Sequence, residues 1–366
     1  MVAGHVCLDI APTFMTVGRL VLAPGKLVDV GPAGIYPGGA VSNTGLALSL
    51  LGADVRLVGR VGADNFGGIV RQEYARFGCA DDLVVDDNVA TAYTVVIAVP
   101  GVDRIYLHHP GANQVFCAAD VTDEALASVT HLHVGYPPQL RRLSADGGSE
   151  LVGLFQRAQH AGVTTSLDMA AVDPESEAGR VDWAGWLANV LPYVDVFTPS
   201  IEELGFMLDR SLYDDWQCRA GGGDVTGVLH VEEDVKPLAA LSQRLGTGVT
   251  LIKCGAPGMY YESGDATRLN RLCRCHGLVE SQWAGLSGFQ PAFEQPLIVS
   301  ALGAGDTSIA AFLIAMLRGD HLARCVQLAA AEGACCVSAP DALSGLLPID
   351  QLAQRIGDGW REVTTC

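Results

Sequence analysis

The chain has 366 residues, of which 49% are hydrophobic and 17% charged, so it can bury a sizeable core as one large α/β domain or two smaller ones. Its 41 acidic and 23 basic residues give a formal net charge of −18. This balance argues against a general binder of nucleic acid or of an anionic membrane, because both require a basic surface. An anionic ligand would have to be held locally, by backbone amides, a metal ion or a few basic side chains.

The eleven cysteines are scattered and form no paired CxxC clusters. This pattern is typical of a reduced, cytoplasmic protein with buried thiols. Cys273, Cys275 and His276 supply only half of a zinc site, so zinc is the less favoured interpretation. Neither a signal peptide nor an apolar run of membrane-spanning length is found, and we expect no membrane partner.

The segment from His5 to Thr13 predicts a short buried strand that stops at Asp9, just before Pro12. A carboxylate at a strand end can accept hydrogen bonds from ligand hydroxyls, although a turn-capping Asp is the simpler alternative. The next stretch, from Phe14 to Val30, alternates apolar residues around a Pro24-Gly25 turn. It predicts a small hairpin.

Gly38 and Gly39 open a predicted helix that carries Asn43 in its first turn. The amides of the glycine pair and the side chain of Asn43 could face a polyhydroxylated ligand, or the pair could be only a tight turn. A strand from Val55 to Val61 and a helix from Phe66 to Phe77 follow. Strands that alternate with helices predict a mostly parallel sheet covered on both faces.

Two β-rich runs around Pro100-Gly101 predict a second hairpin, followed by a PGAN segment that ends at Asn113. The two hairpins, at approximately 12–36 and 90–113, could form a flap of antiparallel strands over the sheet. Such a flap is a candidate lid.

The strand and helix alternation then resumes, with predicted strands at 131–136 and 163–169 and helices at 150–160 and 183–191. A strand from Val194 leads to Ser200 and to two acids, Glu202 and Glu203, in the first turn of the next helix. The helix dipole favours acids there, so helix-start chemistry is the simple interpretation of this pair. A later strand runs into Gly255 and Gly258, where a ligand could approach the backbone closely. The stretch 269–296 is irregular and receives no role.

The stretch from Ala301 to Leu317 predicts a tight loop that leads into a buried helix. Gly303, Ala304 and Gly305 precede Asp306, and the first amides of a helix lack intrahelical partners where its dipole favours negative charge. The functional interpretation is a cradle for a migrating phosphoryl group, with Asp306 as the base for an attacking hydroxyl. The alternative is an Asp N-cap on a core helix.

The sequence contains neither GxxxxGK[ST] nor a GxGxxG that opens a helix after the first strand, so a P-loop enzyme and a dinucleotide-binding Rossmann protein are not supported. The candidate groups instead stand at strand ends and helix starts. In an open α/β sheet these positions meet at the carboxyl edge of the strands.

Together the motifs resemble the ribokinase or PfkB family of carbohydrate kinases over nearly the whole chain. The resemblance rests on GGAVSNTGLALSLLGADVRLVGRVGADNFG (Gly38 to Gly67), on GAGDTSIAAFL (Gly303 to Leu313) and on KCGAPG (Lys253 to Gly258). It implies a single ribokinase-like α/β domain over 1–366, a three-layer sandwich with a mostly parallel central sheet and a small antiparallel β lid. It also implies an ATP-dependent carbohydrate kinase that uses Mg²⁺.

The resemblance further implies a role for each candidate residue. Asp306 would be the catalytic base, and the amides of Gly303, Ala304 and Gly305 the anion hole. The sugar would be held by a set of polar and glycine residues: Asp9, Gly38, Gly39, Asn43 and Asn113. The ATP side would be formed by Ser200, Lys253, Gly255 and Gly258, with Glu203 organising Mg²⁺ through water. The lid would also offer a homodimer contact.

Three departures from the family pattern accompany the resemblance. Ser200 stands where relatives have the Asn of Asn-x-x-Glu, and Ala170 and Val172 replace an Asn and an Arg after Asp168. The usual Asp-Thr-x is Ser300-Ala301-Leu302, so activation by a monovalent cation is doubtful.

Two alternative functions stay open. One is a non-catalytic sugar or nucleotide sensor, suggested by the altered motifs, although a pure binder has no need for the base in the intact GAGD. The other is a nucleoside or heterocycle kinase of the same superfamily. The lid and the PGAN segment favour a carbohydrate over these substrates.

Overall fold

The computed structural model describes residues 1–14, 24–99 and 105–364. Its main sheet has eight strands in the order β14-β13-β12-β11-β10-β9-β1-β4. The strands are β1 (Val2–Gly4), β4 (Leu57–Val58), β9 (His131–Gly135), β10 (Thr164–Asp168), β11 (Val196–Phe197), β12 (Val249–Lys253), β13 (Gly258–Ser263) and β14 (Ser287–Pro291). Neighbours from β4 to β12 are parallel, and β13 and β14 complete one edge in antiparallel pairing. The predicted mostly parallel sheet is therefore confirmed.

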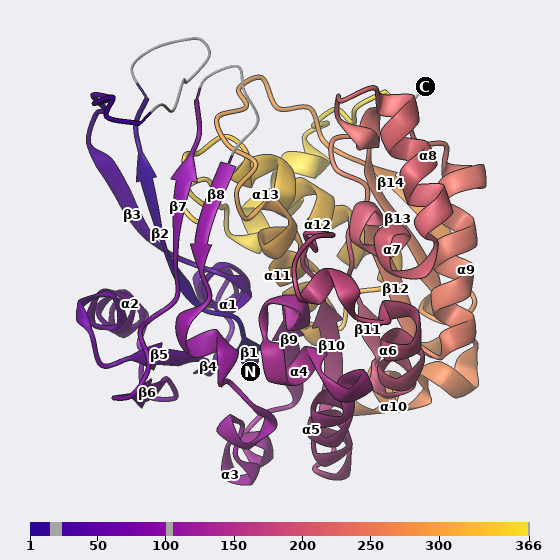
Figure 1. The fold of residues 1–366 in the computed structure, drawn as a ribbon. Coiled ribbons are helices and arrows are strands. Elements are labelled where there is room, and N and C mark those ends of the chain that lie inside the picture. The colour runs from indigo at the N-terminus through magenta and orange to yellow at the C-terminus, as the bar shows by residue number, and fades with distance from the viewer. Residues whose placement is uncertain (15–23, 100–104, 365–366) are drawn as a thin grey trace.

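Helices cover both faces of this sheet, so the molecule has three layers (Figure 1). One face packs α1 (Ala40–Leu50), α2 (Asn65–Arg76), α10 (Ala266–His276), α11 (Ala304–Leu317), α12 (Leu322–Cys336) and α13 (Ile349–Gly357). The other face packs α3 (Asp123–Ala127), α4 (Arg141–Ser144), α5 (Ser149–His160), α6 (Trp183–Val190), α7 (Ile201–Leu208), α8 (Arg210–Ala220) and α9 (Lys236–Leu245). The alternation of side chains along a strand explains this division: in β12, Val249 and Leu251 join the first core and Ile252 the second.

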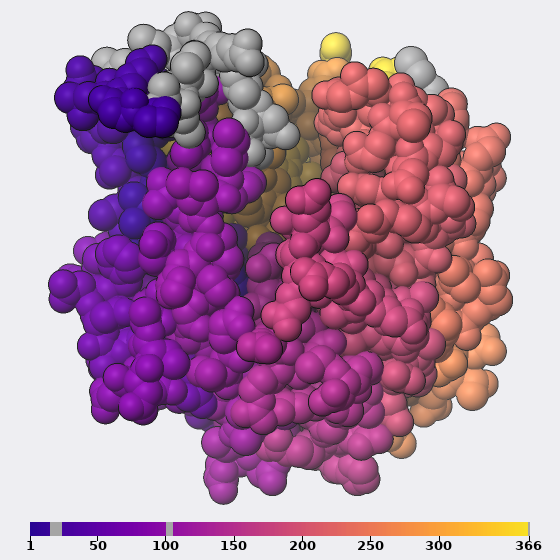
Figure 2. Space-filling model, viewed as in Figure 1, coloured from indigo at the N-terminus to yellow at the C-terminus, as the bar shows by residue number. Residues whose placement is uncertain are grey.

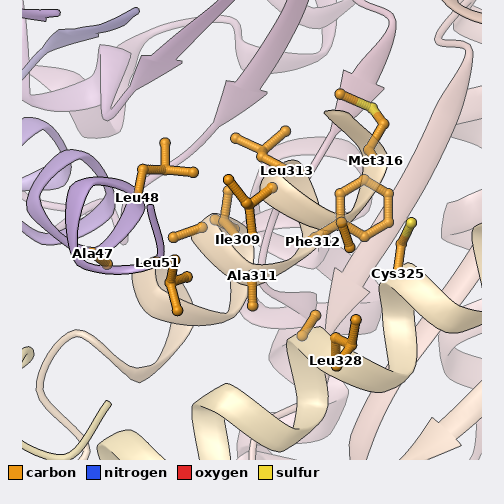
Figure 3. Close-up of a cluster of buried hydrophobic side chains, with 14 of the residues drawn as sticks. Ala47, Leu48, Leu51, Ile309, Ala311, Phe312, Leu313, Met316, Cys325 and Leu328 are labelled. Carbon is orange, nitrogen blue, oxygen red and sulfur yellow. The ribbon is translucent and has the colours of Figure 1, made fainter. Parts of the chain in front are cut away.

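The helix α11 lies at the centre of the first core. Its apolar residues contact α1 on one side and α12 on the other, as the side chains of Leu48, Ile309, Phe312 and Leu328 illustrate (Figure 3). A helix that is apolar around its circumference is typical of a fully buried position. This burial fixes the N-terminus of α11 relative to the ends of the central strands.

A second, smaller sheet stands beside the main one, with strand order β3-β2-β7-β8 (Figure 1). Its strands are β2 (Cys7–Pro12), β3 (Ala33–Gly38), β7 (Tyr93–Ile97) and β8 (Ile105–His109). The β2/β3 and β7/β8 pairs are antiparallel and the β2/β7 pair is parallel. Figure 2 shows the surface hollowed between this small sheet and α8.

The predictions for the N-terminal region need correction. A strand does form within 5–13, but it is β2 of the small sheet and it runs on to Pro12, so Asp9 lies in the middle of the strand, opposite Tyr36, and not at its end. The predicted hairpin over 14–30 lies partly outside the described residues, and 24–30 contains no strand. The antiparallel pair is formed instead by β2 and β3, which flank this stretch. The second predicted pair is present as β7 and β8, while the Pro100-Gly101 turn lies outside the described residues.

Two further segments differ from expectation. The predicted strand over 55–61 is divided between β4 in the main sheet and β5 (Arg60–Gly62), which pairs with β6 (Val84–Asp86). The stretch 269–296 is more regular than expected, because it contains most of α10 and the edge strand β14. No helix in the described part of the chain is both long and apolar enough to cross a membrane.

Candidate active site

A pocket of about 290 Å³ lies where the parallel strands β9 to β12 end and where α7 and α11 begin. The residues that line it are Tyr136, Asp168, Met169, Ser200, Ile201, Glu202, Glu203, Thr226, Lys253, Gly255, Ala301, Gly303, Gly305 and Asp306. Adjacent strands of a parallel sheet end at the same edge, so residues far apart in sequence meet here. The pocket combines acidic groups, one lysine and several glycines.

Asp306 lies in the first turn of α11 and is only 3% exposed. Its Oδ2 accepts a hydrogen bond from Asn43 Nδ2 at 2.9 Å, and its Oδ1 accepts one from Thr44 Oγ1 at 3.3 Å. The hydroxyl of Tyr136 lies 2.8 and 2.9 Å from the two oxygens and donates to them. Burial raises the pKa of Asp306, and the hydrogen bond from Asn43 and the charge of Lys253 oppose this rise.

The N-cap of α11 is Gly303, so the interpretation of Asp306 as an N-cap is wrong. Gly303 has φ 73°, and a Cβ at this position would lie 2.4 Å from the Cβ of Ala342. Only glycine fits this left-handed, crowded turn. The first helical hydrogen bond runs from Thr307 N to Gly303 O, so the amides of Ala304, Gly305 and Asp306 have no intrahelical partner. The Ala304 amide donates instead to Ala301 O at 3.4 Å, across the turn that precedes the helix.

Lys253 and Asp168 form a buried ion pair beside Asp306. The distance from Lys253 Nζ to Asp168 Oδ1 is 2.6 Å. Burial raises the pKa of Asp168, and the charge of Lys253 is the largest opposing influence. Among the described residues, Asp168 Oδ2 has no hydrogen-bond partner although it is buried. An unsatisfied carboxylate oxygen in a pocket wall is suited to a ligand or to metal-bound water.

Ser200 and Glu203 form a capping box at the start of α7. The Ser200 amide donates to Glu203 Oε2 at 2.7 Å, and the Glu203 amide donates to Ser200 Oγ at 3.2 Å. Helix-start chemistry therefore describes this geometry, while both residues also line the pocket. Within the ranges 1–14, 24–99 and 105–364, no group of three or more His, Cys, Asp or Glu side chains is arranged to hold a metal ion.

Asp9, Gly38 and Gly39 lie where the small sheet meets α1. A Cβ on Gly38 would be 2.2 Å from Asp9 Oδ2, and one on Gly39 would be 2.4 Å from His5 Nδ1, so glycine allows both close approaches. Burial raises the pKa of the Asp9 carboxyl, and the charge of Asp306 acts in the same direction. The two carboxylates therefore lie within electrostatic reach of each other, although Asp9 does not line the pocket.

Two predicted ligand residues have other roles in the structure. Asn113 is fully buried, its Nδ2 donates to Val6 O at 2.9 Å, and its Oδ1 accepts from Val6 N at 3.2 Å. Because both ends of its amide are used by the backbone, its prediction as a sugar ligand is corrected. Gly258 does not line the pocket; a Cβ there would lie 2.1 Å from Gln290 O, so this glycine serves the pairing of β13 with β14. Gly255 does line the pocket, against Thr226.

Sequence reasoning gave no site role to Tyr136, Asp168 or Thr226. The sequence does carry a signal for Asp168, because it is an acid at the end of a predicted strand. The neighbouring strands of the sheet also end in polar groups, so this position indicates a place in the site. Tyr136 follows a buried strand and precedes two prolines, and no sequence feature points to its contact with Asp306. Thr226 comes from the short helical turn Val225–Val228, far from the other motifs.

The pocket and its surroundings can be compared with known proteins. The structure resembles the ribokinase from Arabidopsis thaliana complexed with ribose and ATP, with a TM-score of 0.70, 20% identity and 96% of each chain covered. It also resembles an Escherichia coli protein described as ribokinase II in complex with ATP and Mg²⁺, with a TM-score of 0.71, 18% identity and 98% of each chain covered. Among curated proteins, the 2-dehydro-3-deoxygluconokinase of Bacillus subtilis is 24% identical over 86% of this chain and 85% of its own.

These likenesses place the fold in the ribokinase-like α/β class, with its mostly parallel main sheet and small second sheet. The model of the pfkB family carbohydrate kinases matches residues 2–349. The chain therefore belongs to the pfkB family of carbohydrate kinases, whose members are ATP-dependent phosphotransferases.

Proposed function

We propose that the protein transfers the γ-phosphoryl group of ATP to a hydroxyl of a sugar or sugar-like substrate, with Asp306 as the base. The observation that carries this proposal is the position of Asp306: its buried carboxylate lies in the pocket, in the first turn of α11, beside Gly303 and Gly305. A base and a set of helix-start amides at one point can accept a proton and stabilise the transferring phosphoryl group.

The remaining pocket residues supply positioning and charge. Phosphoryl transfer depends more on these than on covalent chemistry. We propose that Lys253 and the amides of Gly303, Ala304 and Gly305 face the phosphates, and that Ser200 and Gly255 border the nucleotide. Gly305 and Lys253 are already close, because a Cβ at Gly305 would lie 3.6 Å from Lys253 Nζ.

The donor set of the pocket fits Mg²⁺, which binds carboxylate and water oxygens. Glu203 lines the pocket, and Asp168 adds a buried oxygen without a partner among the described residues. Since Glu203 Oε2 is committed to the capping box, we propose that Oε1 organises the ion through water. When bound, Mg²⁺ would neutralise the charge of the phosphates.

The sugar side of the site would be formed by Asp9, Gly38, Gly39 and Asn43. Asn43 supports this placement, because it contacts the proposed base directly. We also propose that the whole chain forms one domain in the cytoplasm, with the small sheet as its lid. The edge strand β8 exposes half or more of Ile105 and Leu107, which is consistent with contact to a second copy of the chain through the lid.

Measurement of ADP release tests the proposal. The purified chain is screened against ketoses, aldoses, sugar acids and nucleosides, with and without potassium, next to Asp306→Asn. We expect one acceptor class to give turnover and the variant to lose it by at least about a thousandfold, while circular dichroism and ATP affinity by calorimetry stay unchanged. Retained turnover in Asp306→Asn would contradict the base assignment, and sugar binding without ADP release would indicate a non-catalytic sensor.

A further inference from the structure

The carboxylate of Asp306 is already fully engaged by protein donors. Oδ2 accepts from Asn43 and Oδ1 from Thr44, and both donors are buried on α1. The Tyr136 hydroxyl then contacts both oxygens, at 2.8 and 2.9 Å. A hydroxyl that is to give its proton to Asp306 has to reach one of these oxygens. Of the three donors, only Tyr136 comes from the pocket wall, so it is the one that an incoming hydroxyl would replace.

The backbone holds Tyr136 in this position. Tyr136 has φ 65° and ψ 47°, a left-handed conformation that is costly for a residue with a side chain. Its amide donates to Asp168 O at 3.1 Å, and Pro137 and Pro138 follow directly. A backbone held in this way leaves rotation of the side chain as the available movement.

The ring of Tyr136 also contacts the small sheet indirectly. Its centroid lies 5.9 Å from the ring of His5, whose centroid lies 5.6 Å from the ring of His108 on β8. His5 is buried, and neither of its ring nitrogens has a hydrogen-bond partner within the part of the chain that the structure describes. The ring of Tyr136 is therefore supported by a tilted contact with His5, at an interplanar angle of 37°, that does not fix its hydroxyl. In the part of the chain that the structure describes, its hydroxyl is held by the carboxylate of Asp306.

We infer that the Tyr136 hydroxyl is a placeholder for the acceptor hydroxyl, which occupies Asp306 until an acceptor displaces it and so keeps Asp306 from activating water. This inference rests on the proposed function and deepens it by assigning a residue that selects against water. In the suppressed reaction, Asp306 takes a proton from water while the water oxygen bonds to the γ-phosphorus and the bond to the ADP oxygen breaks. The products of that reaction are ADP and inorganic phosphate.

A water molecule binds the pocket too weakly to displace an internal hydroxyl, whereas a polyhydroxylated acceptor brings several further hydrogen bonds that can offset the exchange. Tyr136 therefore acts as a positioning residue: it makes access to the base depend on the binding energy of the whole acceptor. Removing only its hydroxyl separates this role from that of its ring.

The test compares Tyr136→Phe with Tyr74→Phe. Tyr74 is a matched control, because its fully buried hydroxyl is hydrogen-bonded at 2.8 Å to Ser42 and does not line the pocket. We expect Tyr136→Phe to raise ATP hydrolysis without acceptor by about tenfold or more and to lower KM for the acceptor, with kcat changed by less than about threefold. Tyr74→Phe should leave ATP hydrolysis, KM for the acceptor and kcat unchanged relative to the parent protein.

Calorimetry of acceptor binding without ATP gives a readout that does not depend on turnover. A placeholder predicts that the acceptor binds more tightly to Tyr136→Phe, because no internal hydrogen bond is exchanged. Weaker binding, or unchanged ATP hydrolysis with an unchanged KM, would overturn the inference. A loss of kcat by about a hundredfold with KM unchanged would also overturn it, since Tyr136 would then act in the transition state. Failure of the proposed function appears differently, as absence of turnover in the parent protein with every acceptor.

Discussion

Lys253 and Asp168 form an ion pair of 2.6 Å that joins the ends of β12 and β10, with 12% and 1% of their side chains exposed. These two strands are not neighbours, because the two-residue strand β11 lies between them. The pair therefore bridges the short strand and fixes the spacing of the pocket wall. Breaking such a pair by removing one partner is costly, because the remaining charge is left buried.

Replacement of Lys253 should accordingly destabilise the protein. We expect Lys253→Met to lower the free energy of unfolding by about 3–5 kcal/mol, measured by urea denaturation. The double variant Lys253→Met/Asp168→Asn should recover a large part of this loss, since no charge is then left without a partner. A double variant that is destabilised by the sum of the two single changes would contradict an interacting pair.

Glu332 gives stability a dependence on pH near neutrality. It is fully buried on α12, its Oε1 accepts from the amide of Leu347 at 3.0 Å, and burial raises its pKa from 4.5 to about 8. Between these two values the folded state holds a proton that the unfolded state has lost, so stability falls as the pH rises. Three pH units at about 1.4 kcal/mol each predict that Glu332 contributes a loss of about 4 kcal/mol between pH 5 and pH 8.

The matched variant for this prediction is Glu332→Gln, whose amide oxygen can still accept from Leu347 but carries no charge. Its free energy of unfolding should change less than that of the parent between pH 5 and pH 8, and it should be the more stable protein at pH 8. Equal pH dependence in the two proteins would show that Glu332 ionises in the folded state as it does in the unfolded chain.

His133 should act in the opposite direction at acid pH. It is buried on β9, its Nδ1 lies 2.8 Å from Ser166 Oγ, and burial lowers its pKa from 6.5 to about 3. Below pH 6.5 the unfolded chain binds a proton that the folded state excludes, so stability falls as the pH is lowered toward 3. The free energy of unfolding, measured by denaturation between pH 4 and pH 7, should depend less steeply on pH in His133→Leu than in the parent protein, by close to one proton below pH 6.5. An unchanged dependence would exclude His133 as the buried neutral group.

The turn at Gly303 should be intolerant of a side chain. Gly303→Ala places a Cβ 2.4 Å from that of Ala342 at a positive φ, which we expect to cost more than 1–2 kcal/mol of stability and about a hundredfold in turnover. Gly319→Ala is the control, because Gly319 has φ 89° with nothing within 4 Å of an added Cβ. It should show the backbone penalty alone in thermal unfolding and keep its turnover. Similar turnover in the two variants would show that a side chain at position 303 does not disturb the site, which would contradict this prediction.

The local motifs were predictable because they depend on short-range chemistry. The glycine pair before α1, the Gly303 turn and the acid in the first turn of α11 can be recognised from neighbouring residues alone. The capping box of Ser200 with Glu203 follows the same logic, since its two partners are three residues apart.

Contacts between distant segments were not predictable in this way. Tyr136 and Asp306 are 170 positions apart, and their hydrogen bond depends on the order of the strands in the main sheet. The position of Asp9 was missed for a related reason: the connection at His5 and Val6, directly after Gly4, divides an apolar run between two sheets. The strands that pair with β1 and with β2 come from distant segments of the chain.

The side chain of Asn113 makes two hydrogen bonds to the backbone of Val6, and these constrain the small sheet. Val6 lies in the two-residue connection between β1 and β2, and Asn113 follows β8. This amide therefore joins the segment that enters the small sheet to the segment that leaves it. A rotation of the small sheet against the main one would strain these two hydrogen bonds. The buried amide of Asn113 therefore couples the orientation of the small sheet to the start of the chain.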